Sequence, residues 1–163
     1  MVLAVSIEPA REDDADLLTQ VQQAAAVAAF GHIFPQDLYP FPTETIRAGW
    51  VSALADANVE TYLGRITTEA VGLVSIGYGY LRNLFVVPDH WRTGVGSALH
   101  DHGLGRLKEL GFSEARLWTL TDNAQAQRFY ERRGWTTTGA TRVVPFPPNP
   151  SDIEYRRPLD TTI

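Results

Sequence analysis

The chain has 163 residues, no cysteine and a formal net charge of −5 at pH 7. This length suits one packed domain, and the lack of cysteine excludes disulfides, thiolate zinc sites and a cysteine nucleophile. An acidic chain is a poor nucleic-acid binder, because neutralising phosphates supplies most of that affinity. Since no stretch resembles a signal peptide or a membrane span, we expect a single cytoplasmic domain over residues 1–163, with neither nucleic acid nor a membrane as partner.

The first third of the sequence predicts one strand followed by two helices. Residues 2–10 are expected to form a short strand. An acidic cluster, which suits a helix N-terminus, then precedes apolar residues at helical spacing, so a helix is expected to end near Phe30. A second helix is expected to begin with Thr43 as its N-cap. The intervening residues 31–42 form a loop rich in proline and aromatic residues.

The middle of the sequence predicts three strands and a long helix. The strands are expected over residues 59–66, 70–77 and 80–88, and the short glycine turn before the last of them favours antiparallel pairing. A helical period then runs from Gly94 to Leu110, with Gly111 as its C-cap. Leu110 ends the apolar stripe of this helix. His100 falls on its polar side and His102 on its apolar side, and we interpret both as structural.

The last third of the sequence alternates again between strands and helices. A strand is expected over residues 115–121, a helix over 123–134, and two final strands over 135–144 and 152–159. The proline-rich residues 145–150 are interpreted as a rigid loop between the last two strands. The order β-α-α-β-β-β-α-β-α-β-β predicts a mixed sheet with helices on its faces.

The segment HWRTGVGSAL, residues 90–99, carries two glycines between a strand and a helix. A P-loop is excluded because Gly96 is followed by Ser97 and Ala98 instead of Lys and Ser or Thr. A dinucleotide-binding fingerprint would need a third glycine where Leu99 stands. Two interpretations remain: a plain turn, or a helix N-terminus whose free N–H groups bind a pyrophosphate such as that of coenzyme A.

Two segments together resemble the GNAT superfamily of N-acetyltransferases. FVVPDHWRTGVGSAL is similar to its acyl-CoA-binding motif, although Trp91 stands where Gln or Arg is usual. NAQAQRFYERRGW, residues 123–135, is similar to a second family signature at every fixed position. The resemblance implies an α+β (α/β) fold with a mixed, mostly antiparallel sheet of about six to seven strands and about four helices. It also implies acetyl-CoA as co-substrate, without a metal.

The resemblance implies the residues that serve the acetyl donor. The backbone of residues 92–97 would hold the pyrophosphate, and an N–H near Phe85 or Val86 would polarise the thioester carbonyl. Tyr130 would protonate the leaving sulfur, unless it is a core aromatic, and Asn123 caps its helix or also bonds the pantetheine arm. The expected donor-binding residues are Phe85, Val86, Val87, Arg92, Thr93, Gly94, Val95, Gly96, Ser97 and Asn123.

The general base and the acceptor site are less clear from the sequence. Many family members carry a Glu base on the strand before the CoA motif, and that position is Tyr80 here. The candidate substitutes are His32, Asp37, Glu44 and Asp89, and release of the proton to water is the alternative. Tyr80 and Arg82 are expected to share a strand face that meets the acceptor, with Arg82 favouring a carboxylate. In the loop, Phe34, Tyr39 and Phe41 either wall an apolar acceptor pocket or cover the edge of the core.

These features predict transfer of an acetyl group from acetyl-CoA to a primary amine of a small molecule or a peptide. A homodimer is left open. One alternative is a non-catalytic acyl-CoA sensor, which the missing Glu favours and Tyr130 opposes. Another is an acyltransferase that uses a different acyl-CoA or a hydroxyl acceptor.

Overall fold

A computed structural model describes residues 4–159 of the chain, and the predicted order of helices and strands is confirmed. The strands are β1 (Ser6–Pro9), β2 (Val59–Ile66), β3 (Glu69–Gly77), β4 (Tyr80–Val86), β5 (Glu114–Leu120), β6 (Thr136–Val143) and β7 (Ser151–Pro158). The α-helices are α1 (Ala15–Phe30), α2 (Thr43–Ala55), α3 (Val95–Glu109) and α4 (Ala124–Glu131), and two short 3-10 turns are η1 (Glu12–Asp14) and η2 (Pro88–His90). Residues 2 and 3 of the expected first strand lie outside the described part.

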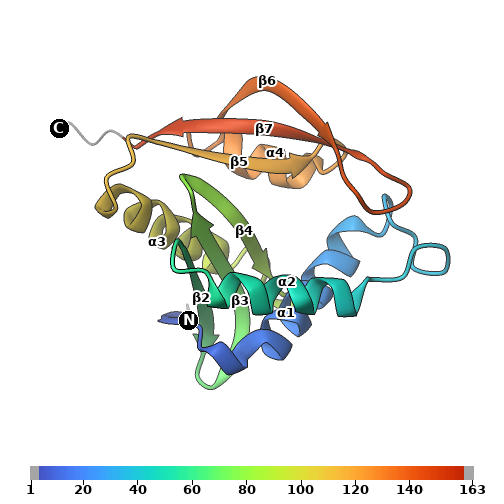
Figure 1. The fold of residues 1–163 in the computed structure, drawn as a ribbon, viewed down its shortest axis with the longest axis horizontal. Helices are drawn as coiled ribbons and strands as arrows, with labels where there is room; N and C mark the ends of the chain where they lie inside the picture. The colour runs from blue at the N-terminus through green and yellow to red at the C-terminus, as the bar shows by residue number, and fades with distance from the viewer. Residues whose placement is uncertain (1–3, 160–163) are drawn as a thin grey trace.

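The seven strands form one sheet in the order β1-β2-β3-β4-β5-β7-β6. Every neighbouring pair is antiparallel except β4 and β5, which are parallel and share a single register pair, Tyr80 with Arg116. Beyond that pair the two strands diverge, so that β5, β7 and β6 form a separate arm of the sheet (Figure 1). The predicted mixed, mostly antiparallel α+β fold is confirmed, and its sheet splits between β4 and β5.

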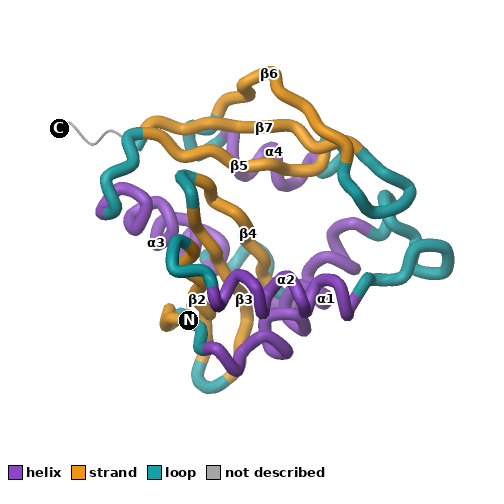
Figure 2. The backbone as a smooth tube through the Cα atoms, viewed as in Figure 1, coloured by secondary structure: helices purple, strands orange, loops and turns teal. Residues whose placement is uncertain are grey.

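Helices cover both faces of the sheet (Figure 2). On one face, Leu18 of α1 and Trp50 of α2 pack with Leu63 and Leu73 of the sheet. On the other face, α3 and α4 share a second core, whose fully buried members include Leu99, Leu107, Val74, Ile76, Trp135 and Tyr155. No helix within residues 4–159 is long and apolar enough to cross a membrane.

Three sequence-based details of the helices are wrong. Thr43 is the first residue of α2 and not its cap, because Pro42 holds the N-cap position and the Thr43 hydroxyl bonds back to the Phe41 carbonyl. Leu110 is 50% exposed, because α3 ends at Glu109 and Gly111 turns the chain away with a φ of +97°. His100 is only 1% exposed, although the helical pattern predicts that it lies on the polar side of α3. Phe129 of α4 and Trp135 pack against that side and bury it.

Candidate functional site

A cavity of about 560 Å³, called the donor cavity below, lies where β4 and β5 diverge. It is lined from α1, β4, the start of α3, and α4. The sequence-predicted residues on its wall are Phe85, Val86, Arg92, Gly94, Gly96, Ser97, Asn123 and Tyr130. Val87, Thr93 and Val95 are not among the lining residues: the Val87 N–H bonds back to Val71, the Thr93 hydroxyl donates to the His90 carbonyl, and Val95 is 2% exposed.

The start of α3 presents free backbone donors to this cavity. Arg92 and Gly94 both have left-handed backbone conformations, with φ of +62° and +93°, and they shape the loop before the helix. The first helical bond joins Ala98 N–H to the Gly94 carbonyl, and the N–H groups of residues 94–97 donate to no protein group in the described chain. Such a helix start, with successive N–H groups around a turn, can bind an anion.

The register of β4 decides which backbone groups reach the cavity. The Val87 N–H donates to the Val71 carbonyl on β3 at 2.9 Å. Because bonding alternates along an antiparallel pair, the Phe85 N–H also points to β3, whereas the Val86 N–H points toward the diverging β5. The Val86 carbonyl on that same edge accepts the Trp91 indole N–H at 2.6 Å. Of the two N–H groups considered from sequence, that of Val86 faces the cavity.

Tyr130 combines a buried ring with a hydroxyl that bonds no group in the described part of the chain. The residue is 9% exposed and lines the donor cavity, with its ring edge-to-face against Phe129 and Trp135. Among residues 4–159, no group hydrogen-bonds its hydroxyl. Burial raises the pKa of Tyr130 well above the ordinary value for tyrosine, so the phenol keeps its proton at neutral pH.

Asn123 and three arginines complete the α4 side of the donor cavity. Asn123 caps α4 by accepting the Ala126 N–H at 3.2 Å and also lines the cavity. The arginines, which sequence reasoning missed, are Arg128, Arg132 and Arg133. The Arg133 guanidinium lies 3.6 Å over the Phe129 ring and donates to the Ser97 hydroxyl, which joins α4 to the start of α3. With Arg92, these cations make the cavity basic, and no carboxylate or histidine is among its described lining residues.

A second pocket of about 420 Å³, called the aromatic pocket below, adjoins the first through Phe30, which lines both. Phe34, Tyr39 and Phe41 wall it, which supports the pocket interpretation of the α1–α2 loop. The β6–β7 loop, which reaches toward the α1–α2 loop in Figure 1, adds Val144, Phe146 and Pro147. Asp152 of β7 is the one charged residue that the structure describes on its wall.

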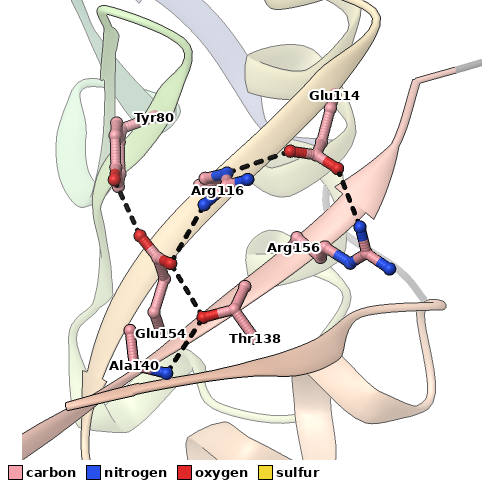
Figure 3. Close-up of polar contacts among 7 residues, drawn as sticks. All are labelled: Tyr80, Glu114, Arg116, Thr138, Ala140, Glu154 and Arg156. Atoms are coloured by element: carbon pink, nitrogen blue, oxygen red, sulfur yellow. Dashed lines mark hydrogen bonds and ion pairs between the residues drawn. The ribbon is translucent and has the colours of Figure 1, made fainter.

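Tyr80 and Arg82, the residues expected to meet the acceptor, lie outside both pockets. The Tyr80 hydroxyl donates to Glu154 at 2.7 Å (Figure 3). Arg82 is exposed at a β-bulge. The sequence-proposed bases His32, Asp37, Glu44 and Asp89 are also absent from both walls. Within residues 4–159, no three His, Asp or Glu side chains gather as a metal site would require.

Comparisons with known proteins agree with this architecture. The family model described as Acetyltransferase (GNAT) family matches residues 22–135. An uncharacterized N-acetyltransferase, YafP of Escherichia coli (strain K12), is 32% identical over 121 residues, which cover 74% of this chain and 73% of that protein. A mycothiol acetyltransferase of Geodermatophilus obscurus is 40% identical over 68 residues, or 42% of this chain and 20% of that protein.

Solved structures share the fold at low identity. The PaiA N-acetyltransferase of Thermoplasma acidophilum, solved in complex with coenzyme A, has a TM-score of 0.79 and 14% identity, covering 96% of this chain and 99% of that one. The ribosomal-protein-S18-alanine N-acetyltransferase of Escherichia coli has a TM-score of 0.72 and 20% identity, covering 98% and 97%. At these identities the likeness establishes the fold alone.

Proposed function

Since the chain belongs to the GNAT family of acetyltransferases, we propose that it transfers the acetyl group of acetyl-CoA directly to a primary amine of a small molecule or a peptide. The observation that carries this proposal is the donor cavity, where a basic wall, a helix start with free N–H groups and a protonated tyrosine meet. The coenzyme A bound by the related PaiA enzyme supports the same donor here.

The described residues fit coenzyme A at both ends of the cavity. The free N–H groups of residues 94–97 would hold the pyrophosphate, because they are unpaired donors at the positive end of a helix. Arg92, Arg128 and Arg132 would balance the remaining phosphate charge. The exposed edge of β4 at Val86 would pair with the amides of the pantetheine arm, as an added strand does.

The reaction requires two contributions from this chain: stabilisation of the carbonyl oxygen and a proton for the leaving sulfur. Acetyl-CoA supplies an activated thioester; the amine nitrogen bonds to its carbonyl carbon as the carbon–sulfur bond breaks. The Val86 N–H would stabilise the charge on the carbonyl oxygen, a task for which one backbone donor contributes about 3 kcal/mol. Tyr130 would give its proton to the departing sulfur. The amine would release its proton to water, because no carboxylate or histidine is among the described residues lining the donor cavity.

That same lack of a base favours one second candidate, an acyl-CoA sensor without turnover. Calorimetric titration with acetyl-CoA, with NADH as the comparison, tests the donor site that both functions share. Micromolar binding of acetyl-CoA without NADH binding is expected, and failure to bind acetyl-CoA or CoA would contradict both. Release of CoA in the presence of a panel of amines then separates them: amine-dependent release is expected of the enzyme, and tight binding without it would make the chain a sensor.

A further inference from the structure

We propose that the aromatic pocket binds the acceptor as a small ammonium ion with an apolar body, and that Asp152 recognises its charge. This proposal rests on the proposed function, because it names the class of amine that the acetyl group reaches. The pocket adjoins the donor cavity at Phe30 and has the volume of a small-molecule site.

One wall of the pocket is held in place by a single side-chain amide. Gln36 donates to the Phe34 carbonyl at 2.9 Å and to the Tyr39 carbonyl at 3.3 Å, and it accepts the Phe41 N–H at 2.9 Å. The three residues that it fixes are the aromatic residues of this wall. A wall whose backbone is already fixed loses little conformational entropy when a ligand binds.

The opposite wall, from the β6–β7 loop, is fixed in the same way. The Val144 N–H bonds to the Pro150 carbonyl at 2.8 Å, and the Asn149 N–H bonds to the Phe146 carbonyl at 2.7 Å. The Asn149 side chain also donates to the Val144 carbonyl at 3.1 Å. Both walls are therefore preformed, and the apolar residues that they contribute favour an apolar body between them.

Asp152 gives this apolar pocket a negative charge. Its side chain is 11% exposed, and its Oδ2 accepts Arg142 Nε at 3.1 Å. Within residues 4–159 no hydrogen bond to Asp152 Oδ1 is found, so this oxygen is open to an N–H donor of a bound ligand. An ammonium ion would supply that donor, and the aromatic residues that line the same pocket could attract its charge further. An anionic acceptor would be repelled by the same carboxylate.

Calorimetry with three probes tests this assignment on the intact protein. 2-Phenylethylamine carries both the charge and the apolar body, ethanolamine lacks the apolar body, and 3-phenylpropionate has the opposite charge. We expect 2-phenylethylamine to bind at least tenfold more tightly than either of the others. We expect Asp152→Asn to weaken its binding by about tenfold or more, the scale of one charged hydrogen bond, and to leave acetyl-CoA binding unchanged.

Arg142→Gln is the matched control, because it breaks the same ion pair and keeps the carboxylate. It should bind 2-phenylethylamine within threefold of the wild type, with melting temperatures showing that both variants fold. Equal binding of the three probes, or equal losses in the two variants, would overturn the proposal. If the amine binds as expected but acetyl-CoA does not, the proposed function fails and the ammonium pocket stands. If acetyl-CoA binds but 2-phenylethylamine does not, the ammonium pocket fails and the proposed function stands.

Discussion

The Tyr80 hydroxyl donates a 2.7 Å hydrogen bond to Glu154, which ties the first residue of β4 to β7 across β5 (Figure 3). Glu154 also accepts from Arg116 at 3.2 Å and from Thr138 at 2.8 Å, and it is 4% exposed. Burial alone would raise the pKa of Glu154, but these donors hold it below the ordinary value for glutamate. The ionised carboxylate therefore joins the two arms of the sheet where β4 and β5 are still paired.

Replacing Tyr80 tests whether this contact is structural. We expect Tyr80→Phe to lower the free energy of unfolding by about 1 kcal/mol, because Glu154 loses one donor of three. Urea unfolding measures this change, and steady-state kinetics should give a kcat/KM within threefold of the wild type. A large rise in the acceptor KM at unchanged stability would instead return Tyr80 to the acceptor site, where the sequence placed it.

Replacing Tyr130 tests the acid that protonates sulfur. We expect Tyr130→Phe to lower kcat by about 100-fold, the usual scale for a lost general acid. The acetyl-CoA Kd should stay within threefold, because the change removes a hydroxyl that bonds no described protein group. Tyr155→Phe is the control: Tyr155 is also buried, but its hydroxyl donates to Glu131 and it lines neither pocket. Equal kcat losses in both variants would contradict the role of Tyr130 as the acid that protonates sulfur.

The sequence predicts the fold and much of the donor cavity because the informative residues are close together in the chain. The glycine loop, within residues 90–99, and the α4 signature, residues 123–135, are each one short continuous stretch, so the spacing of their residues is readable from the sequence. Trp91 shows the limit of that reading. It departs from the expected motif, and only the structure reveals that its indole bonds the Val86 carbonyl.

The acceptor side was harder to predict because distant segments build it. The aromatic pocket joins the α1–α2 loop, the β6–β7 loop and Asp152 of β7, and no local motif relates these segments. Arg82 lines neither pocket, and its expected role at the acceptor stays a prediction. A β-bulge in the pairing of β4 with β3 leaves Arg82 without a register partner and exposed, a local irregularity that the alternating sequence pattern does not reveal.

Replacing Gly94 tests the left-handed turn before α3. A side chain at Gly94 would meet no atom within 4 Å, so its cost comes from the φ of +93° and not from a clash. We expect Gly94→Ala to lower the free energy of unfolding by about 1–2 kcal/mol, or to shift the loop to a less strained conformation. In either case it should weaken acetyl-CoA binding by about tenfold. Gly105→Ala, inside α3 and without a positive φ, should leave binding unchanged and stabilise the helix slightly. Calorimetry measures the acetyl-CoA Kd of both variants. An unchanged Kd for Gly94→Ala would show that this turn does not contribute to donor binding.

His100 makes stability depend on pH in a direction that can be measured. Its ring accepts the Trp135 indole N–H at Nε2 and bonds Asp101 at Nδ1, which requires the neutral form. Burial lowers the pKa of His100 below its ordinary value of 6.5, so the unfolded chain takes up a proton at a pH where the native protein does not. Stability is therefore full above about pH 6.5 and falls as the pH drops toward the native pKa.

We expect urea unfolding of the wild type to show a loss of about 1 kcal/mol from this residue between pH 7.5 and 5.5. His100→Gln keeps an acceptor for Trp135 but cannot titrate, so its unfolding free energy should fall less over the same interval. Burial also lowers the pKa of His102, which acts in the same direction. Because His102 is present in both proteins, the difference between the two curves isolates His100. Parallel curves would mean that His100 titrates alike in the folded and unfolded chains, and that burial beside Trp135 does not hold it neutral.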